Sequence, residues 1–315
     1  RRDFRANPYV HHFQMSTTMP SIKIASLLIG LILLSCKDEK PTISELDSIT
    51  FHDPQAVVVE GYEGHLMEPF LTRDGSILFF NNLNDSTANT NLHWCTKIND
   101  TLFEYQGELA GVNTESLEGV PTMDAQGHFF YVYTGDYEQT LSTIYVGQYA
   151  AGSIADSELV EHISREMGGW VNFDVEVSND GNTLYFVDGR FDASGGPYES
   201  NLVIAEKDGD QFARADNSEE LLKNINTADL EYAAAISKDE LEICFTRVAA
   251  PLTASSAPKI FIANRSSKTE PFSEARQISN LTGFIEAPTY TSDVQAIYFH
   301  KKVDGIHKLY IARKQ

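Results

Sequence analysis

Five acidic residues recur along the chain, each six to eight residues before an aspartate that opens a turn. Carboxylates gathered at one place support two kinds of chemistry. A pair can work as general acid and general base, and a larger group can bind a cation such as calcium. Like charges at short range also raise each other's pKa. The five residues are Glu68, Glu118, Asp174, Glu231 and Glu286.

The elements that position these acids belong to a phrase that occurs five times. Typical copies are EPFLTRDGSILFF (68–80) and DVEVSNDGNTLYF (174–186). Asp-Gly favours a tight turn, and the alternating aromatic residues that follow favour a half-buried strand, so each copy predicts a hairpin. A third strand follows each hairpin, and a fourth is predicted in most units, including 220–226 in the third. The turn aspartates, 50 to 59 residues apart, are Asp74, Asp124, Asp180, Asp239 and Asp293.

Four antiparallel strands repeated at this interval are typical of a β-propeller, in which each sheet packs on the next and closure protects the edges. We count five blades, since a six-bladed ring would need a unit that is not found. The fifth unit ends after its third strand, while 55–69 parallels 275–288. Ala56 to Glu60 is therefore predicted to close the last blade. The predicted all-β domain covers residues 51–315.

The repeated phrase resembles the WD-repeat-like propeller repeats of TolB-type proteins over residues 55 to 315. Asn113-Thr114 and Asn226-Thr227 also resemble the linker common in that family. This family includes binding and scaffold proteins without chemistry of their own, so the resemblance implies a non-catalytic module. The matching residues are Glu68, Pro69, Asp74, Gly75, Glu118, Pro121, Gly127, Asp180, Gly181, Leu184, Tyr185, Phe186, Glu286, Pro288 and Asp293.

The beginning of the chain predicts targeting rather than folded structure. Residues 15–35 contain an eleven-residue apolar run and are typical of a signal peptide. The run ends in Leu-Leu-Ser-Cys, which resembles the lipobox of bacterial lipoproteins, so Cys36 is expected to carry the lipid. Residues 36–50 are then a tether, and 1–14 an upstream extension outside the fold. The resemblance implies an outer-membrane protein, at the periplasmic face or the cell surface.

The charge narrows the choice of partner. The chain carries a formal charge of −21, and removing residues 1–35 takes away four basic residues and one acidic residue, which leaves −24. Such a surface repels nucleic acid and anionic lipid, so the lipid anchor is the only membrane contact expected. An envelope protein or a glycan remains as partner. Cys95 and Cys244 lie in apolar strand patterns and are expected to be buried thiols.

Three roles remain open for the five acids. Each could cap its own blade, they could bind calcium together, or some could catalyse glycoside hydrolysis, for which Glu118, Asp174 and Glu231 are the candidates. Hydrolysis needs two carboxyl groups about 5 to 9.5 Å apart. The sequence favours a non-catalytic binding or scaffold module with the five acids as candidate binding residues and no cofactor other than calcium. A five-bladed propeller glycoside hydrolase is the alternative.

Loop lengths give one further indication. The joins at 81–91, 188–200 and 247–258 are long, and they form a recognition surface if they gather on one rim. Gly168-Gly169-Trp170 lies in a segment leading into a blade, from which it could reach the mouth of a central channel.

Overall fold

The computed structural model describes residues 48–84 and 89–315. The predicted upstream extension, the signal peptide, Cys36 and most of the predicted tether lie outside the described residues. In the described part of the chain, no helix has the length and apolar character needed to cross a membrane.

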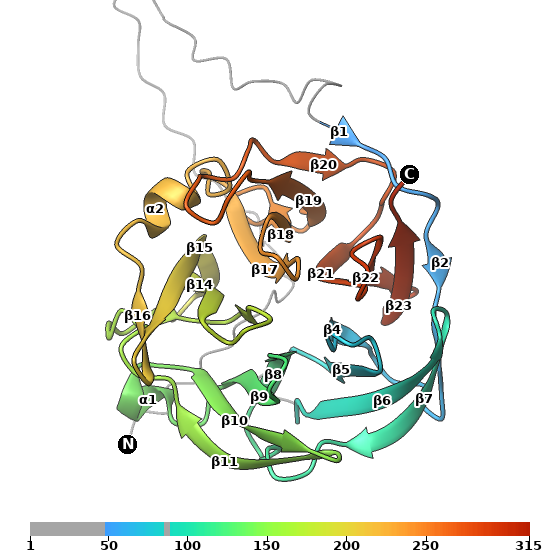
Figure 1. The fold of residues 1–315 in the computed structure, drawn as a ribbon, viewed down its shortest axis with the longest axis horizontal. Coiled ribbons are helices and arrows are strands. Elements are labelled where there is room, and N and C mark those ends of the chain that lie inside the picture. Colours follow the sequence, from blue (N-terminus) through green and yellow to red (C-terminus); the bar gives the residue numbers. More distant parts are fainter. Residues whose placement is uncertain (1–47, 85–88) are drawn as a thin grey trace, which may run out of the picture.

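The chain forms an all-β propeller of five blades around a central axis (Figure 1). Each blade is an antiparallel sheet whose first strand lies innermost and whose last strand lies at the rim. The hydrophobic core lies between adjacent blades, in five clusters of buried side chains. The predicted fold class is confirmed.

From the axis outward, blade 1 contains β4 (Met67–Leu71), β5 (Ile77–Asn81), β6 (Leu92–Asn99) and β7 (Leu102–Glu108). In the same order, blade 2 contains β8 (Glu118–Met123), β9 (His128–Tyr133), β10 (Ile144–Ala150) and β11 (Ser153–Leu159). Blade 3 contains β13 (Val175–Val177), β14 (Thr183–Asp192), β15 (Gly195–Asp208) and β16 (Gln211–Arg214), and β12 (Trp170–Val171) also pairs with β14. Blade 4 contains β17 (Leu230–Ile236), β18 (Glu242–Val248), β19 (Lys259–Asn264) and β20 (Arg276–Ile278). Blade 5 contains β21 (Ile285–Tyr290), β22 (Ala296–Val303) and β23 (Ile306–Arg313).

The N-terminal segment ties three blades together, which differs in part from the prediction. Only β2 (Gln55–Ala56) closes blade 5, antiparallel to β23, whereas β3 (Val58–Glu60) pairs in parallel with β7 of blade 1. β1 (Ser48–Ile49) pairs with β20 of blade 4. The segment changes blade because Val57 and Val59 are buried in the cluster that blades 5 and 1 share. In Figure 1, β1 and β2 are blue and run along the outer edge of the ring, β1 beside β20 and β2 beside the red β23.

The fourth strand predicted at 220–226 is wrong. That stretch contains the end of the short helix α2 (Ser218–Leu221) and a turn, and the outer strand of blade 3 is β16, which lies earlier in the chain. Leu221, Leu222 and Ile225 all pack into one core cluster. Their spacing suits a helical turn and not the alternation of a strand. The other helix is α1 (Tyr137–Thr140), between β9 and β10.

The repeated turn aspartates hold the first hairpin of each blade. In blade 1 Asp74 accepts hydrogen bonds from the Thr72 hydroxyl at 2.6 Å and from the backbone N–H of Ser76 at 3.0 Å. Asp180, Asp239 and Asp293 accept the same bond from a serine or threonine two residues earlier. This local bonding stabilises the turn without tertiary contacts, which explains why the turn is readable in the sequence.

Arg73 crosses the axis at the end of the channel where these turns lie. From blade 1 its guanidinium donates to the Glu176 carboxylate and to the Val177 carbonyl, both at 2.6 Å and both in blade 3. It also donates to the Ile236 carbonyl of blade 4 at 3.2 Å. Glu176 further accepts from the Thr122 hydroxyl of blade 2 at 2.7 Å. One buried ion pair therefore joins four blades.

The substitution Arg73→Met tests this cross-channel contact. It leaves Glu176 buried without its cation, and removing one partner of a buried pair costs about 3–5 kcal/mol of unfolding free energy. Urea denaturation measures the loss. The control is Arg313→Met, which removes an exposed pair with Asp100 and is expected to cost about 0–1 kcal/mol. If Arg73→Met costs no more than the control, the pair does not stabilise the ring.

Candidate functional site at the channel mouth

The five predicted acids do not share one structural position. In blades 1, 2, 4 and 5 the innermost strand contains a two-residue bulge. The first residue of each bulge has a left-handed backbone, namely Glu68, Val120, Ala233 and Ala287. The acids differ in where they lie relative to the bulge. Glu286 is the last paired residue before its bulge, and Glu68 is the first residue within its bulge. Glu118 and Glu231 each lie one residue before the last paired residue. Asp174 directly precedes β13, which has no register shift.

Glu118 and Glu231 cap their own blades. Glu118 accepts from the Thr114 hydroxyl at 2.5 Å and from its backbone N–H at 3.0 Å. Glu231 accepts the same two bonds from Thr227, at 2.7 and 3.1 Å, and also binds Arg247 at 2.7 Å. Both side chains are thus occupied within their own repeats.

The preceding asparagine of each Asn-Thr linker adds to this arrangement. Asn113 exchanges hydrogen bonds with the backbone of Leu92, and Asn226 does the same with Leu202. The linker therefore ties the third strand of one blade to the innermost strand of the next. The sequence resemblance at these residues corresponds to a structural joint.

The other three acids meet where the innermost strands begin, an end of the axis that we call the channel mouth. Glu286 accepts a hydrogen bond from the Tyr232 hydroxyl and lies 3.1 Å from Nε2 of His300. The backbone N–H of Glu68 donates to Nδ1 of His300 at 3.2 Å. Nδ1 is thus an acceptor, which places the ring proton on Nε2, facing Glu286. Asp174 accepts from the backbone N–H of Ala233 at 3.3 Å.

Burial controls the electrostatics of the channel mouth. Glu68 and Asp174 are 8% and 4% exposed. Burial raises the pKa of both carboxyls, and the neighbouring carboxylates, Glu286 for Glu68 and Glu68 for Asp174, raise them further. Burial and the same carboxylates raise the pKa of the Tyr232 hydroxyl. The raised pKa values favour the protonated carboxyls, which relieves the repulsion between like charges.

The channel leaves little room beside these groups. The axial cavity, lined by the bulge residues of four blades and by Val175 and Glu176 of blade 3, has a volume of about 20 Å³. That volume holds roughly one water molecule. Within residues 48–84 and 89–315, no group of three or more histidine, cysteine, aspartate or glutamate side chains is arranged to hold a metal ion. The thiols of Cys95 and Cys244 are free and buried.

Blade 3 differs from the other blades at the face of the ring that carries the channel mouth. β14 and β15 continue past the end of β13 as a long hairpin, so the predicted loop 188–200 is largely strand. β12 pairs with β14 and so lies at the edge of this hairpin, with Trp170 opposite Arg190. The join at 247–258 and the described ends of the join at 81–91 also link second to third strands and lie on the same face of the ring as the channel mouth.

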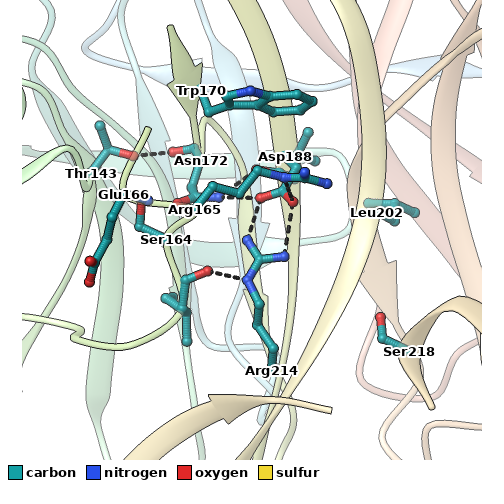
Figure 2. Close-up of polar contacts among 12 residues, drawn as sticks. Thr143, Ser164, Arg165, Glu166, Trp170, Asn172, Asp188, Leu202, Arg214 and Ser218 are labelled. Atoms are coloured by element: carbon teal, nitrogen blue, oxygen red, sulfur yellow. Dashed lines mark hydrogen bonds and ion pairs between the residues drawn. The ribbon is translucent and has the colours of Figure 1, made fainter. Parts of the chain in front are cut away.

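A polar network at the base of this hairpin was not identified in the sequence (Figure 2). The side chain of Asp188 lies between Arg165 and Arg214, beneath the Trp170 indole. The two arginines are 23 residues before and 26 residues after Asp188 and lie in irregular or short outer segments. Only the Gly168-Gly169-Trp170 segment gave a signal in the sequence.

Comparison with solved structures supports the fold. No protein-family model and no curated protein matches the sequence. A structure described as a glycoside hydrolase superposes with a TM-score of 0.58 at 10% identity, over 85% of this chain and 92% of that one. An α-L-arabinanase from Cellvibrio cellulosa gives 0.51 at 13% identity, over 79% and 91%. TolB from Acinetobacter baumannii is also a structural neighbour, with 0.43 at 12% identity, over 79% and 55%. At these identities the first two similarities establish the fold alone, and the TolB score supports no further argument.

The raised pKa of Asp174 predicts a specific pH dependence. The folded protein keeps a proton that the unfolded chain releases near its unfolded pKa of 3.8, so the free energy of unfolding falls as pH rises above that value. Asp174→Asn keeps an acceptor for Ala233 and removes the charge. We expect it to flatten this fall and to raise stability at neutral pH, measured by urea denaturation from about pH 4 to 8.

Asp293→Asn is the control with the opposite sign. The Thr291 hydroxyl and the Gln295 N–H lower the pKa of Asp293, so its contribution is present above an unfolded pKa of 3.8 and is lost as pH falls. That variant should be less stable than the parent at neutral pH. An unchanged slope in Asp174→Asn would contradict the burial of a protonated carboxyl at this position.

Proposed function

We propose that this protein is a non-catalytic binding module of the cell envelope, which uses the rim of the propeller to hold a protein or glycan partner. The observation that carries the proposal is the closed channel mouth. Glu68 and Asp174 are buried, all three carboxylates accept hydrogen bonds, and the axial cavity that Glu68 lines holds about one water. A glycosidase needs two carboxyl groups that a sugar can reach.

The rim is the more suitable binding surface for the same reason. Side chains that are buried and hydrogen-bonded gain little from a ligand, whereas long joins on a rigid scaffold are free to contact one. The lipid anchor at Cys36 and a place at the outer membrane are part of the proposal. The apolar run and the Leu-Leu-Ser-Cys sequence support them.

A glycoside hydrolase is the second candidate. The fold similarity to a glycoside hydrolase and to an arabinanase favours it, and so do the raised pKa values of Glu68 and Asp174, since a general acid must hold its proton near neutral pH. In this case Glu68, Asp174 and Glu286 are the reactive set. Of the trio expected from the sequence, only Asp174 remains, because Glu118 and Glu231 are occupied as caps.

Turnover and binding assays on the purified protein separate the two candidates. Neutral and acidic polysaccharides of envelopes and plant walls are screened for released sugar and, in parallel, for binding. We expect no product from the parent protein. Any binding should persist in Asp174→Asn and Glu286→Gln, because those carboxylates do not face the ligand.

One result would overturn the proposal in favour of the enzyme. That result is sugar released by the parent protein but not by Asp174→Asn or Glu286→Gln, while Glu118→Gln, whose carboxyl caps blade 2, still releases it. The thermal melting temperature of each variant shows that a loss of product is not a loss of fold.

A further inference from the structure

The network at Asp188 holds more positive charge than the carboxylate requires. Asp188 is 1% exposed and accepts four hydrogen bonds. Arg214 donates two of them, at 2.6 and 2.9 Å, Nε of Arg165 donates one at 2.7 Å, and the Asn172 amide donates one at 2.9 Å. Arg214 alone would neutralise the charge with its paired bonds. The second guanidinium leaves a local charge of +1 on a chain whose formal charge is −21.

Arg165 is held firmly yet keeps free donors. Its Nε is bound to Asp188, and its guanidinium carbon lies 4.1 Å from the centre of the Trp170 ring. Its side chain is 42% exposed. In the described part of the chain, neither of its terminal amino groups has a hydrogen-bond partner. Figure 2 shows Glu166 directed away from this guanidinium. A fixed arginine with an open edge is suited to bind a carboxylate in the bidentate manner.

Trp170 is equally well positioned. Its carbonyl accepts a hydrogen bond from the Tyr137 hydroxyl at 2.8 Å, and β12 fixes it beside Arg190. Gly169 has a φ of +87°, and a Cβ there would lie 2.8 Å from the Phe191 carbonyl oxygen, so only glycine fits before the tryptophan. On the same blade Met167 and Tyr198 are 56% and 43% exposed. Tyr198 packs against Arg190, the residue opposite Trp170, so exposed aromatic surface continues from the Arg165–Trp170 pair along the hairpin.

We propose that this surface of blade 3, formed by Arg165, Trp170 and Tyr198, binds an acidic glycan through the carboxylate of a uronic acid. The two terminal amino groups of Arg165 would donate hydrogen bonds to the carboxylate, and the exposed aromatic surface would pack against the apolar C–H face of the sugar ring. A peptide carboxylate offers the first contact but not the rigid ring face. This inference rests on the proposed binding function and names its ligand class.

The negative charge on the rest of the protein surface limits which acidic glycans can bind. Its repulsion extends about 8–10 Å at moderate ionic strength, so only uronates that are few or well separated can approach the site without penalty. A densely charged polymer is repelled by the rest of the protein. The site therefore selects a short or sparsely charged acidic chain.

Isothermal titration calorimetry with α-1,4-linked trigalacturonic acid and its methyl ester tests the inference on the purified protein. The two probes have the same rings and differ in charge. We expect the acid to bind and the ester to bind about tenfold more weakly or worse, since hydrogen bonds to a charged group are lost. Arg165→Gln should lose about the same factor, and Arg165→Lys should recover only part of it, because lysine lacks the planar fork.

Arg313→Gln is the matched control, because Arg313 of blade 5 is 45% exposed and is likewise bound to one aspartate, Asp100 of blade 1. It should bind the acid as the parent does. Equal affinity for acid and ester, or parent-like binding by Arg165→Gln, overturns the inference. So does an Arg165-dependent affinity for a glutamate-rich peptide in place of the sugar.

The outcome is separable from that of the proposed function. If trigalacturonic acid is not bound but another polysaccharide is bound without product, this inference fails and the binding module stands. If trigalacturonic acid is bound through Arg165 and is also cleaved, the site stands and the non-catalytic function fails.

Discussion

Charges buried on the axis constrain the rest of this propeller. Five blades direct their innermost strands at a common line, and polar groups there lose water, so each needs a partner within the ring. Arg73 and Glu176 satisfy this need at one end and join four blades. At the other end Glu286 bonds to Tyr232 and His300, and Glu68 bonds to Asn84. The polar groups on the axis are consequently paired with one another at both ends.

Because the polar groups on the axis are paired with one another, the side chains that a ligand can reach lie at the rim. Blade 3 carries the longest hairpin, and the loop before it is tied to blade 2 through Tyr137 and to blade 3 through Asp188. This double attachment holds Arg165 and Trp170 without burying them. Buried partners that fix an exposed donor are the usual basis of a preorganised binding site. The fold similarity to glycoside hydrolases is thus compatible with the proposed site away from the axis.

Local and long-range interactions account for what the sequence could predict. The turn aspartates bond to residues within two to four positions along the chain, so the five hairpins and the five blades could be predicted from the sequence. The bulges could not be predicted, because the left-handed backbone of Glu68 and of Ala287 depends on packing around the axis. A shift of one residue relative to the bulge places acids of the same repeat differently. Asp188 is joined to two arginines, each more than twenty positions away in an unlike segment, which leaves no periodic signal.

Hydrogen–deuterium exchange of the innermost strands tests most directly whether the axis is closed. The N–H groups of Glu68, Ala233 and Ile236 donate to His300, Asp174 and Glu176 across blade boundaries. If the axis is closed, they exchange only through global unfolding, as core strands do. Exchange as fast as in the rim join 247–258 would show that the channel mouth opens in the folded protein, and it would contradict a closed, non-catalytic axis.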